Sequence, residues 1–332
     1  MKYEKQPISF EAQADRLLAR GLIADRAELV RRSGAVNYYR LSGFLHPFRE
    51  RVETPGSGPE ITVTVGDNFK PGTTLELVWE RYTFDRRLRL LLMDAIERIE
   101  VSVRTRMVQD FSRQHGPFGY LSPQNLPNLN VEDYLKWRTK LAGNSARSRE
   151  AFAKHFFEKY GDEHPELPLW MLCELMDFGG MQTFYRGMEH DMRQQVAKTF
   201  GLADELLDSW LRALNTVRNA CAHHSRVWNR EWGTKPMLPA KNKFPDWHRI
   251  WDTTSNAWVL PPRRAGAAPA FERDRTGVVL TICHYWLGLA AHTTQWRGRV
   301  VALFDEYPRV PLPSMGLPGQ WREHPLWAEV TP

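Results

Sequence analysis

The sequence predicts an all-α protein that carries one small β element, and two patterns support this prediction. Apolar residues recur at helical spacing through most of the chain, most clearly over residues 74–115. Only residues 61–65 alternate apolar and polar side chains, with β-branched residues, in the manner of a strand. We therefore expect a helical protein with a short strand or a small hairpin near residue 61.

The composition is that of a folded globular protein. Of the 332 residues, 42% are hydrophobic and 25% are charged, which matches ordinary globular chains. At roughly 100–200 residues per domain, the length allows two domains or one elaborated domain. The best apolar stretch, residues 278–291, is shorter than the ~18 residues of a membrane span. We expect no membrane partner and, because no secretion signal opens the sequence, a cytoplasmic protein.

Cysteine content and charge narrow the function classes. Cys173, Cys221 and Cys283 lie far apart with no C-x-x-C pair, which predicts buried reduced thiols and no cysteine-based zinc site. The sequence lacks the patterns of phosphate loops, dinucleotide-binding loops, nucleophile elbows, metalloproteases and EF-hands. We therefore expect no cofactor and no metal. The net charge of +6 favours a polyanionic partner such as nucleic acid, because positive charge attracts phosphates.

Periodicity and capping residues divide the chain into expected elements. A helix is expected over residues 9–20 with Ser9 as its cap, and an amphipathic helix is expected from Asp204, as its cap, to about Ser225. Further helices are expected over residues 26–33, 74–115, 131–141, 148–160, 169–178, 191–200 and 276–304. Residues 233–275, which are rich in Pro, Trp and basic groups, are expected to be irregular.

These elements group into three expected segments. Residues 1–60 form an N-terminal helical region, and residues 61–232 form the helical core. Residues 233–332 combine a basic, Trp-rich segment with a helix and an extended tail, and we expect them to pack on the core.

The end of the helix that begins at Asp204 carries the side chains best suited to catalysis. Arg218, Asn219, His223 and His224 place a cation, an amide and two imidazoles within seven residues. A histidine can take a proton from a ribose 2′-hydroxyl or give one to a leaving oxygen. An arginine can stabilise the charge that builds up on phosphorus. This combination is typical of phosphodiester chemistry.

An arginine followed by a histidine is a weak pattern by itself. Similar spacings occur elsewhere in this basic chain, namely Arg40 to His46 and Arg149 to His155. Asn219 distinguishes the pair of Arg218 and His223, because it lies four residues before His223 on the same helix face, where its amide can orient the ring. On an ideal helix, Arg218 and His223 point about 140° apart. Either the helix ends here, or two chains each lend their motif across a two-fold axis; we prefer the second, which predicts a homodimer.

Two interpretations of His224 stay open. It falls beside the apolar stripe of the helix, which suits a partly buried structural histidine, and it also neighbours His223. Arg226 belongs to the same polar cluster, and His224 and Arg226 are both supporting candidates for the site. Cys221 lies within the apolar stripe and is expected in the core.

At these residues the chain resembles the HEPN ribonuclease superfamily, whose R-N-x-x-x-H motif corresponds here to Arg218, Asn219 and His223. The resemblance is closer still to the abortive-infection (Abi) proteins of the AbiD/AbiF type, and it extends over nearly the whole chain. The segments that carry it are residues 7–10, 37–43, 84–89, 95–100, 221–226 and 321–327.

The resemblance implies a HEPN-type helical bundle with an N-terminal helical extension and an irregular C-terminal wrap. It also implies a homodimeric, metal-independent endoribonuclease that leaves a 2′,3′-cyclic phosphate and acts as an antiphage toxin. Arg218, Asn219 and His223 carry over as its catalytic residues. Proteins of this type look like ancestors of RNA-guided CRISPR effectors, and some pair with a small RNA. A structured small RNA is therefore an expected partner, as an antitoxin or a guide.

Two acidic residues of the long helix, Glu97 and Glu100, match the family pattern, and so does Arg86, without a clear catalytic role. An unpaired charge inside a helical bundle is costly, so these carboxylates are expected to neutralise Arg218 or Arg104. Structural support of the site is their expected role.

Tyr38, Tyr39 and Arg40 are candidates for RNA binding. They lie in an aromatic segment, residues 37–44, and aromatic and guanidinium faces stack on unpaired bases. The favoured alternative is that these rings pack the N-terminal helices onto the bundle.

Lys241, Lys243 and Arg249 are the second group of RNA-binding candidates. They belong to the basic, Trp-rich stretch over residues 235–264, which would suit a guide RNA. The alternative is that this stretch only wraps the surface of the core.

The leading hypothesis is a homodimeric ribonuclease in which His223 is the acid and base, Arg218 holds the scissile phosphate and Asn219 orients the histidine. One alternative is a non-catalytic RNA-binding module that assembles with a structured small RNA. A second alternative is a nucleotide sensor that binds a mononucleotide phosphate with Arg218. Cleavage of single-stranded RNA that depends on His223 separates the first hypothesis from the other two.

Overall fold

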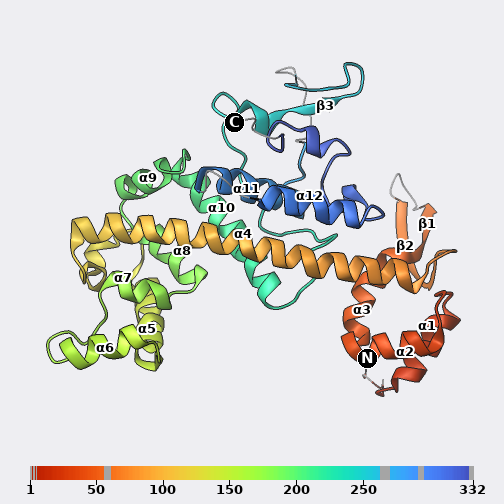
Figure 1. Cartoon of the computed structure of the whole chain (residues 1–332), viewed down its shortest axis with the longest axis horizontal. Helices are drawn as coiled ribbons and strands as arrows, with labels where there is room; N and C mark the ends of the chain where they lie inside the picture. The colour runs from red at the N-terminus through yellow and green to blue at the C-terminus, as the bar shows by residue number, and fades with distance from the viewer. Residues whose placement is uncertain are drawn as a thin grey trace. The chain divides into compact units, whose positions relative to one another are not determined.

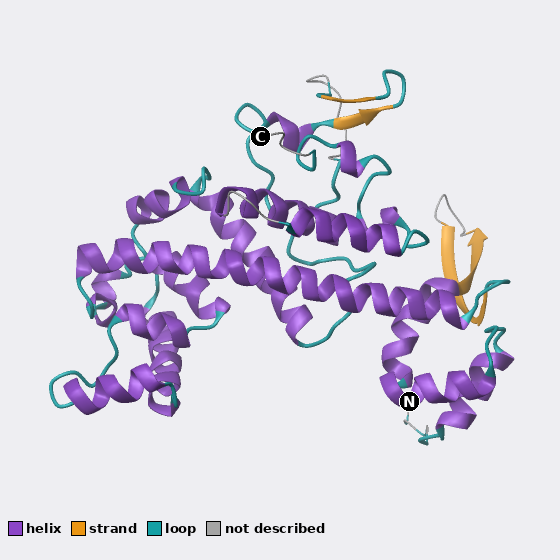
Figure 2. Cartoon of the chain, in the orientation of Figure 1, coloured by secondary structure: helices purple, strands orange, loops and turns teal. Residues whose placement is uncertain are grey.

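The computed structural model of the chain describes residues 2, 4, 6–55, 61–261, 270–290 and 295–328. Within these residues the secondary structure comprises twelve α-helices and two small two-stranded sheets, which confirms the predicted all-α class (Figure 1, Figure 2). The chain divides into two compact units, Met1–Leu88 with Leu303–Val310, and Arg89–Ala302 with Pro311–Pro332. Both units take residues from the segment 61–232 that we expect to be the core.

The first unit holds three short helices and a hairpin. These are α1 (Phe10–Ala19), α2 (Arg26–Val36), α3 (Tyr38–Leu45), β1 (Arg49–Pro55) and β2 (Ile61–Phe69), followed by the first part of α4 (Leu75–His115). Ser9 caps α1 as predicted, because its hydroxyl accepts a hydrogen bond from the Ala12 N–H at 3.2 Å. β1 and β2 pair antiparallel, with Val52 opposite Thr64. The strand predicted over residues 61–65 is confirmed as part of this hairpin.

The second unit holds the rest of α4 and most of the other helices. These are α5 (Val131–Arg147), α6 (Ala151–Tyr160), α7 (Leu169–Leu172), α8 (Phe178–Gly187), α9 (His190–Lys198), α10 (Asp204–Ala222), α11 (Thr276–Ala290) and the larger part of α12 (Trp296–Glu306). α10 contacts α8, α9 and α11. α10 is therefore held by packing on elements that precede and follow it in the sequence.

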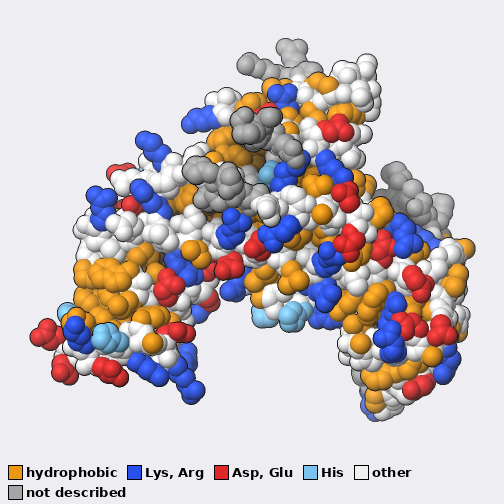
Figure 3. All heavy atoms as spheres, in the orientation of Figure 1, with side chains coloured by type: hydrophobic (Ala, Val, Ile, Leu, Met, Phe, Trp, Pro, Cys, Tyr) orange, Lys and Arg blue, Asp and Glu red, His pale blue; other side chains and the backbone are white. Residues whose placement is uncertain are grey.

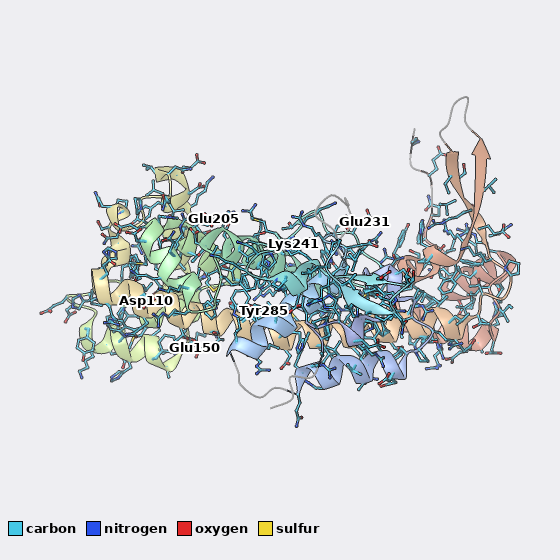
Figure 4. The ribbon with its side chains drawn as sticks, turned by 90° about the horizontal axis from the view of Figure 1, so that it is seen from above. Asp110, Glu150, Glu205, Glu231, Lys241 and Tyr285 are labelled. Carbon is cyan, nitrogen blue, oxygen red and sulfur yellow. The ribbon has the colours of Figure 1, made fainter. Side chains whose placement is uncertain are left out.

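An aromatic cluster anchors α10 to the elements that follow it. Trp210 of α10 is fully buried, and its ring centroid lies 5.2 Å from that of Trp247 and 6.0 Å from that of Trp286. Tyr285 of α11, which is labelled in Figure 4, lies edge-on to Trp210 at 5.8 Å. Such ring contacts add to the hydrophobic burial. They fix α10 against α11 and against the segment around Trp247.

The predicted helix over residues 169–178 is wrong. The structure has the short α7, a 3-10 turn (Cys173–Leu175) and a new helix, α8, that begins at Phe178. The break occurs because Asp177 takes an extended backbone, and its carboxylate accepts from the Gly180 N–H at 2.8 Å. This N-cap starts α8 and carries it to Gly187.

The expectation of irregular structure over residues 233–275 is also partly wrong. A 3-10 helix (Pro245–His248) precedes a small antiparallel hairpin of β3 (Ile250–Asp252) and β4 (Ala257–Val259). Trp251 and Trp258 are partners in this hairpin. Residues 262–269 of the segment expected to be irregular, and residues 291–294 of the helix predicted over residues 276–304, lie outside the described residues.

Asp204 does not cap α10, contrary to the prediction. Ala203 has the N-cap position, and Asp204 is the first helical residue, with a buried side chain. The Asp204 carboxylate pairs with His190 at 3.2 Å and with Arg193 at 3.5 Å. A carboxylate in the first turn also suits the positive end of the helix dipole. The three cysteines are all free and buried, as predicted.

Candidate functional site

α10 carries the predicted site residues on the faces that its buried stripe leaves open. The stripe consists of Leu207, Trp210, Leu211, Leu214 and Val217, each at most 1% exposed. Arg218 is half-buried at the edge of this stripe, whereas Asn219 and His223 are exposed. Burial of the stripe therefore holds Arg218 against the protein and turns Asn219 and His223 to solvent.

The end of α10 has the hydrogen bonds of a Schellman motif around His223 and His224. The Ser225 N–H donates to the Ala220 carbonyl at 2.8 Å, and the His224 N–H donates to the Cys221 carbonyl at 3.0 Å. His223 is the C-cap, and His224 follows it with a left-handed backbone at φ 55°. Glycine usually takes this position, because a Cβ is crowded there. The motif exposes two consecutive imidazoles at the end of the helix.

Figure 3 shows this end of α10 as a patch of histidine side chains with Lys and Arg side chains beside it. Within the described part of the chain, the His223 side chain has no hydrogen bond or ion pair. Its ring is therefore open to a ligand. His224 does have a partner in the structure.

The side chains of the motif do not pair as the spacing suggests. The Arg218 Nη1 donates to the Asn219 Oδ1 at 3.3 Å. No hydrogen bond joins the side chains of Asn219 and His223 among the described residues. Arg218 and Asn219 thus form one polar group, and His223 lies one helical turn further along.

Two carboxylates lie close enough to Arg218 for its charge to act on their pKa values. Burial raises the pKa of Glu100 above its usual value, and the charges of Arg104 and Arg218 offset this only in part. Burial would also raise the pKa of Asp177, but a hydrogen bond from Lys140, the Gly180 N–H and the Lys140 and Arg218 charges outweigh it and lower that pKa. Arg218 therefore lies at the edge of the buried core, within a network of positively and negatively charged side chains.

Arg104 completes this network. It forms an ion pair with Glu100 one turn earlier on α4, and its Nη2 also donates to the Met176 carbonyl at 3.0 Å. Lys140 of α5 pairs with Asp177 at 2.6 Å. The pairing of Glu100 with Arg104 agrees with the sequence analysis, which missed Asp177 and Lys140. Asp177 gives a local signal, as a cap before two glycines, whereas Lys140 reaches the site through tertiary packing.

The two acidic candidates on α4 have different surroundings. Glu100 is buried beside Arg104 and Arg218, as the expected supporting role requires. Glu97 is exposed, and no ion pair joins it to another residue in the described ranges. Arg226 is half-buried after the end of α10, and its carbonyl accepts from Arg230 at 3.3 Å.

A polar stripe runs along α10 toward His223. Its members are Asp208, Arg212, Asn215, Asn219 and His223, which recur every three or four residues and so share one side of the helix. Asp208 accepts from Arg186 of α8 at 2.8 Å and from Arg212 at 2.9 Å. The stripe therefore includes one cation, Arg212, and is bordered by another, Arg186 of α8.

The remaining RNA-binding candidates lie in three places. Tyr38, Tyr39 and Arg40 form the first turn of α3 in the other unit. Lys243 is exposed, and the exposed Lys241 donates to the Pro261 carbonyl at 3.1 Å. Arg249 pairs with Asp246 at 2.7 Å and donates to the Trp258 carbonyl at 3.1 Å, which gives it a structural role in the β3–β4 hairpin.

The residues that the structure describes lack two features that would change the class of the site. Among the described residues, no group of three or more His, Cys, Asp or Glu side chains is arranged to hold a metal ion. None of the helices in those same residues combines the length and apolar character that a membrane span needs.

The match to known proteins covers α10 and its motif. A family model described as Abi-like protein matches residues 34–229, more than half of the chain. No curated protein and no solved structure matches the chain. By its match to this family model, which extends from α2 through the end of α10, the chain belongs to the Abi-like protein family.

Proposed function

We propose that this protein is a metal-independent endoribonuclease of the HEPN type, which acts in the cytoplasm as an abortive-infection toxin against phage. The observation that carries the proposal is the end of α10, where the exposed His223 and Asn219 accompany the half-buried Arg218 in the order R-N-x-x-x-H. An exposed site at a helix end admits a polymer, which a closed pocket would not.

The reaction that suits these groups is transesterification within RNA. His223 takes the proton of the 2′-hydroxyl, and the 2′-oxygen attacks the adjoining phosphorus. The bond from phosphorus to the 5′-oxygen breaks, and that oxygen receives a proton from an imidazolium. Arg218 stabilises the charge that develops on the phosphoryl oxygens. The products are a 2′,3′-cyclic phosphate and a 5′-hydroxyl, so atoms and charge balance without a metal.

A dimer would supply both parts of the site. Arg218 and His223 diverge by about 140° around one helix, so a phosphate held by one chain's Arg218 would need the partner's His223. Leu90 and Val101 lie on one face of α4 and are 66% and 51% exposed. These exposed apolar side chains support a subunit contact on the second unit, which also carries α10. They lie three turns apart on the helix, which is the spacing of a continuous face.

The first experiment is a cleavage assay. Purified protein is incubated with labelled single-stranded RNA and EDTA, and products are tested for a cyclic phosphate. We expect His223→Ala to lower the rate by at least about 100-fold. His155→Ala is the matched control, because His155 is also exposed and follows Arg149 by six residues, close to the five that separate Arg218 and His223. Cleavage that needs a divalent ion, or that survives His223→Ala, would reject the mechanism.

A mixing experiment tests the composite site. Arg218→Ala and His223→Ala chains are each inactive alone, but a mixed dimer contains one site in which both residues are intact if the two chains share each site. We expect about a quarter of the wild-type activity after mixing at equal amounts, since about half of the dimers are mixed. If mass spectrometry verifies that mixed dimers have formed and no cleavage activity is recovered, the shared site is rejected.

The second candidate function is a non-catalytic RNA-binding module that assembles with a structured small RNA as antitoxin or guide. Arg186 and Arg212, the two cations at the polar stripe of α10 that pair with Asp208, support it, because positive charge attracts phosphates. It predicts RNA that copurifies with the protein and salt-sensitive binding that His223→Ala leaves unchanged. Sequencing of the released RNA identifies the partner.

A further inference from the structure

The largest cavity among those found in the first unit lies between the start of α1 and the start of α3. It has a volume of about 720 Å³, and Phe10, Gln13, Arg16, Asn37, Tyr38 and Tyr39 are among the residues that line it. This volume is within the range of small-molecule sites. The lining combines aromatic rings, side-chain amides and one cation, and the proposed cleavage reaction uses none of them.

The aromatic walls of the cavity are held by neighbouring residues and are open to solvent. Phe10 lies against α2, because a Cβ placed on Gly34 would be 3.7 Å from the Phe10 ring. The Tyr38 hydroxyl accepts a hydrogen bond from Arg20 at 3.4 Å, which helps to fix the position of the Tyr38 ring. Tyr39 crosses Tyr38 edge to face at 5.8 Å and is 76% exposed, which is unusual for so large a ring. An aromatic face is therefore available at the mouth of the cavity.

The turn that presents these tyrosines is strained. Asn37 has φ 65° and ψ 141°, a backbone conformation that residues other than glycine rarely adopt. It ends α2, since its N–H donates to the Ser33 carbonyl at 3.0 Å, and it starts α3, since its Oδ1 accepts from the Tyr39 N–H at 2.9 Å. Strain of this kind is concentrated at ligand-binding sites. Here it sets the direction of Tyr38 and Tyr39.

The polar groups of the cavity suit the base edge and the phosphate of a nucleotide. The Gln13 amide is oriented by its donation to the Ile8 carbonyl at 3.1 Å, which leaves its Oε1 without a partner in the described part of the chain. Every nucleobase carries an N–H donor on its edge. Arg16 is exposed, and no carboxylate pairs with it among the described residues, so its charge is available to a phosphate.

We infer that this cavity, the Phe10–Tyr39 pocket, binds an unpaired nucleobase that stacks on Tyr39 while Arg16 contacts an adjoining phosphate. The inference rests on the proposed function only for the source of the base, which we take to be a single-stranded segment of RNA. Stacking on an aromatic ring does not select a sequence, and it needs a base that is free of a partner strand. The pocket thus selects single-stranded over fully paired RNA.

Binding is measured by fluorescence anisotropy with a labelled single-stranded oligonucleotide, with all variants in the His223→Ala background so that the RNA is not cut. We expect Tyr39→Ala to weaken binding by between about 5-fold and 150-fold, the range for one stacked base. Tyr39→Phe is the matched control and should bind within about twofold of the parent, because the ring is kept. Tyr39 is exposed, so neither variant should change thermal unfolding.

Two further measurements sharpen the test. Arg16→Gln should make the affinity less dependent on salt. The magnitude of the slope of the logarithm of affinity against the logarithm of salt concentration should fall by about 1. Fully paired RNA should bind equally to the parent and to Tyr39→Ala. AMP is titrated as a second probe: if it binds in the parent and not in Tyr39→Ala while the oligonucleotide is unaffected, the base comes from a free nucleotide and the RNA source is wrong.

The inference is overturned if Tyr39→Ala binds both the oligonucleotide and AMP as the parent does, or if the parent binds neither. These outcomes are separate from the fate of the proposed nuclease. Loss of binding in Tyr39→Ala, together with no cleavage by the native chain under any condition, would keep the pocket and reject the catalytic site. Cleavage that depends on His223 without any effect of Tyr39 would do the reverse.

Discussion

The His224 N–H donates to the Cys221 carbonyl at 3.0 Å, and this bond closes α10 with a histidine at the left-handed position that favours glycine. The φ of 55° places the His224 Cβ in a crowded position. His224 therefore closes the helix at a cost in free energy, and its exposed side chain contradicts the interpretation of a partly buried structural histidine. The backbone and the imidazole can be tested separately.

We predict that His224→Gly raises the free energy of unfolding relative to His224→Ala by about 1 kcal/mol. Glycine adopts this φ without the clash that any Cβ suffers, and both variants lose the ring. Urea unfolding of the two variants measures the difference. If His224 only closes the helix, both variants should keep the cleavage rate of the native chain. If the rate falls equally in both while stability differs, the ring takes part in the reaction.

The sequence predicts α4 almost to the residue because one property runs through the whole element. The apolar residues of its inner face stay in phase over many turns and are all buried, namely Val78, Leu88, Leu92, Ala95, Ile99, Val103 and Met107. The helix predicted over residues 169–178 fails at Asp177, where a local N-cap interrupts an apolar run. The β3–β4 hairpin is missed because strands of three residues are too short to show alternation. Long periodic patterns therefore predict elements well, and single capping residues decide their boundaries.

The candidate site, like the fold, can be predicted from the sequence only in part. Arg218, Asn219 and His223 can be placed at the end of one helix from the sequence, since they follow a clear amphipathic stripe. Their surroundings cannot, because Glu100 and Asp177 come from elements 118 and 41 residues away in the sequence. Patterns within a single sequence do not predict such long-range contacts. The expected bond between Asn219 and His223 illustrates this, because helix geometry permits it and Arg218 takes the Asn219 oxygen instead.

Arg104→Met tests the charge network behind Arg218. Arg104 and Glu100 form a mostly buried ion pair, and removal of the cation leaves the carboxylate with Arg218 as the remaining nearby positive charge. We expect the free energy of unfolding to fall by about 3 kcal/mol at pH 8. The loss should shrink as the pH is lowered, because burial already raises the pKa of Glu100 and protonation removes the unpaired charge.

Arg106→Met is the matched control on the same helix. Arg106 pairs with Asp110 at 2.8 Å, with a spacing of four residues as in the pair of Glu100 and Arg104, but 45% of its side chain is exposed. We expect a loss below about 1 kcal/mol that does not depend on the environment of Arg218. Equal losses in the two variants would contradict the assignment of Arg104 to a buried network.

Asn37 has two roles that substitution can separate. Asn37→Ala removes the cap on the Tyr39 N–H and keeps a Cβ at φ 65°, so we expect the free energy of unfolding to fall by about 1–2 kcal/mol. Asn37→Gly removes the cap and also relieves the strain, so its loss should stay below about 0.5 kcal/mol. Thermal unfolding of both variants measures these changes. A greater loss for glycine than for alanine would show that the backbone at Asn37 is not strained.

Stability should fall in mild acid because of two histidines packed near the C-terminal tail. Burial lowers the pKa of His324 to about 4, and burial likewise lowers the pKa of His284 to about 4. The His324 Nδ1 accepts from the Leu326 N–H at 3.2 Å, which requires a neutral ring, and His284 stacks on Trp327 at 4.8 Å. In the unfolded chain both rings take up a proton near pH 6.5.

The sign follows from proton uptake. Between about pH 6.5 and pH 4 the unfolded chain binds more protons than the folded chain at these rings, so lower pH favours unfolding. Their contribution is complete above pH 6.5 and is lost as the pH falls toward 4. Urea unfolding at pH 7.5 and pH 4.5 measures the change, and His324→Asn, which keeps an acceptor for the Leu326 N–H without a titrating ring, should show a smaller decrease than the native chain. An equal decrease in that variant would assign the acid sensitivity to groups other than His324.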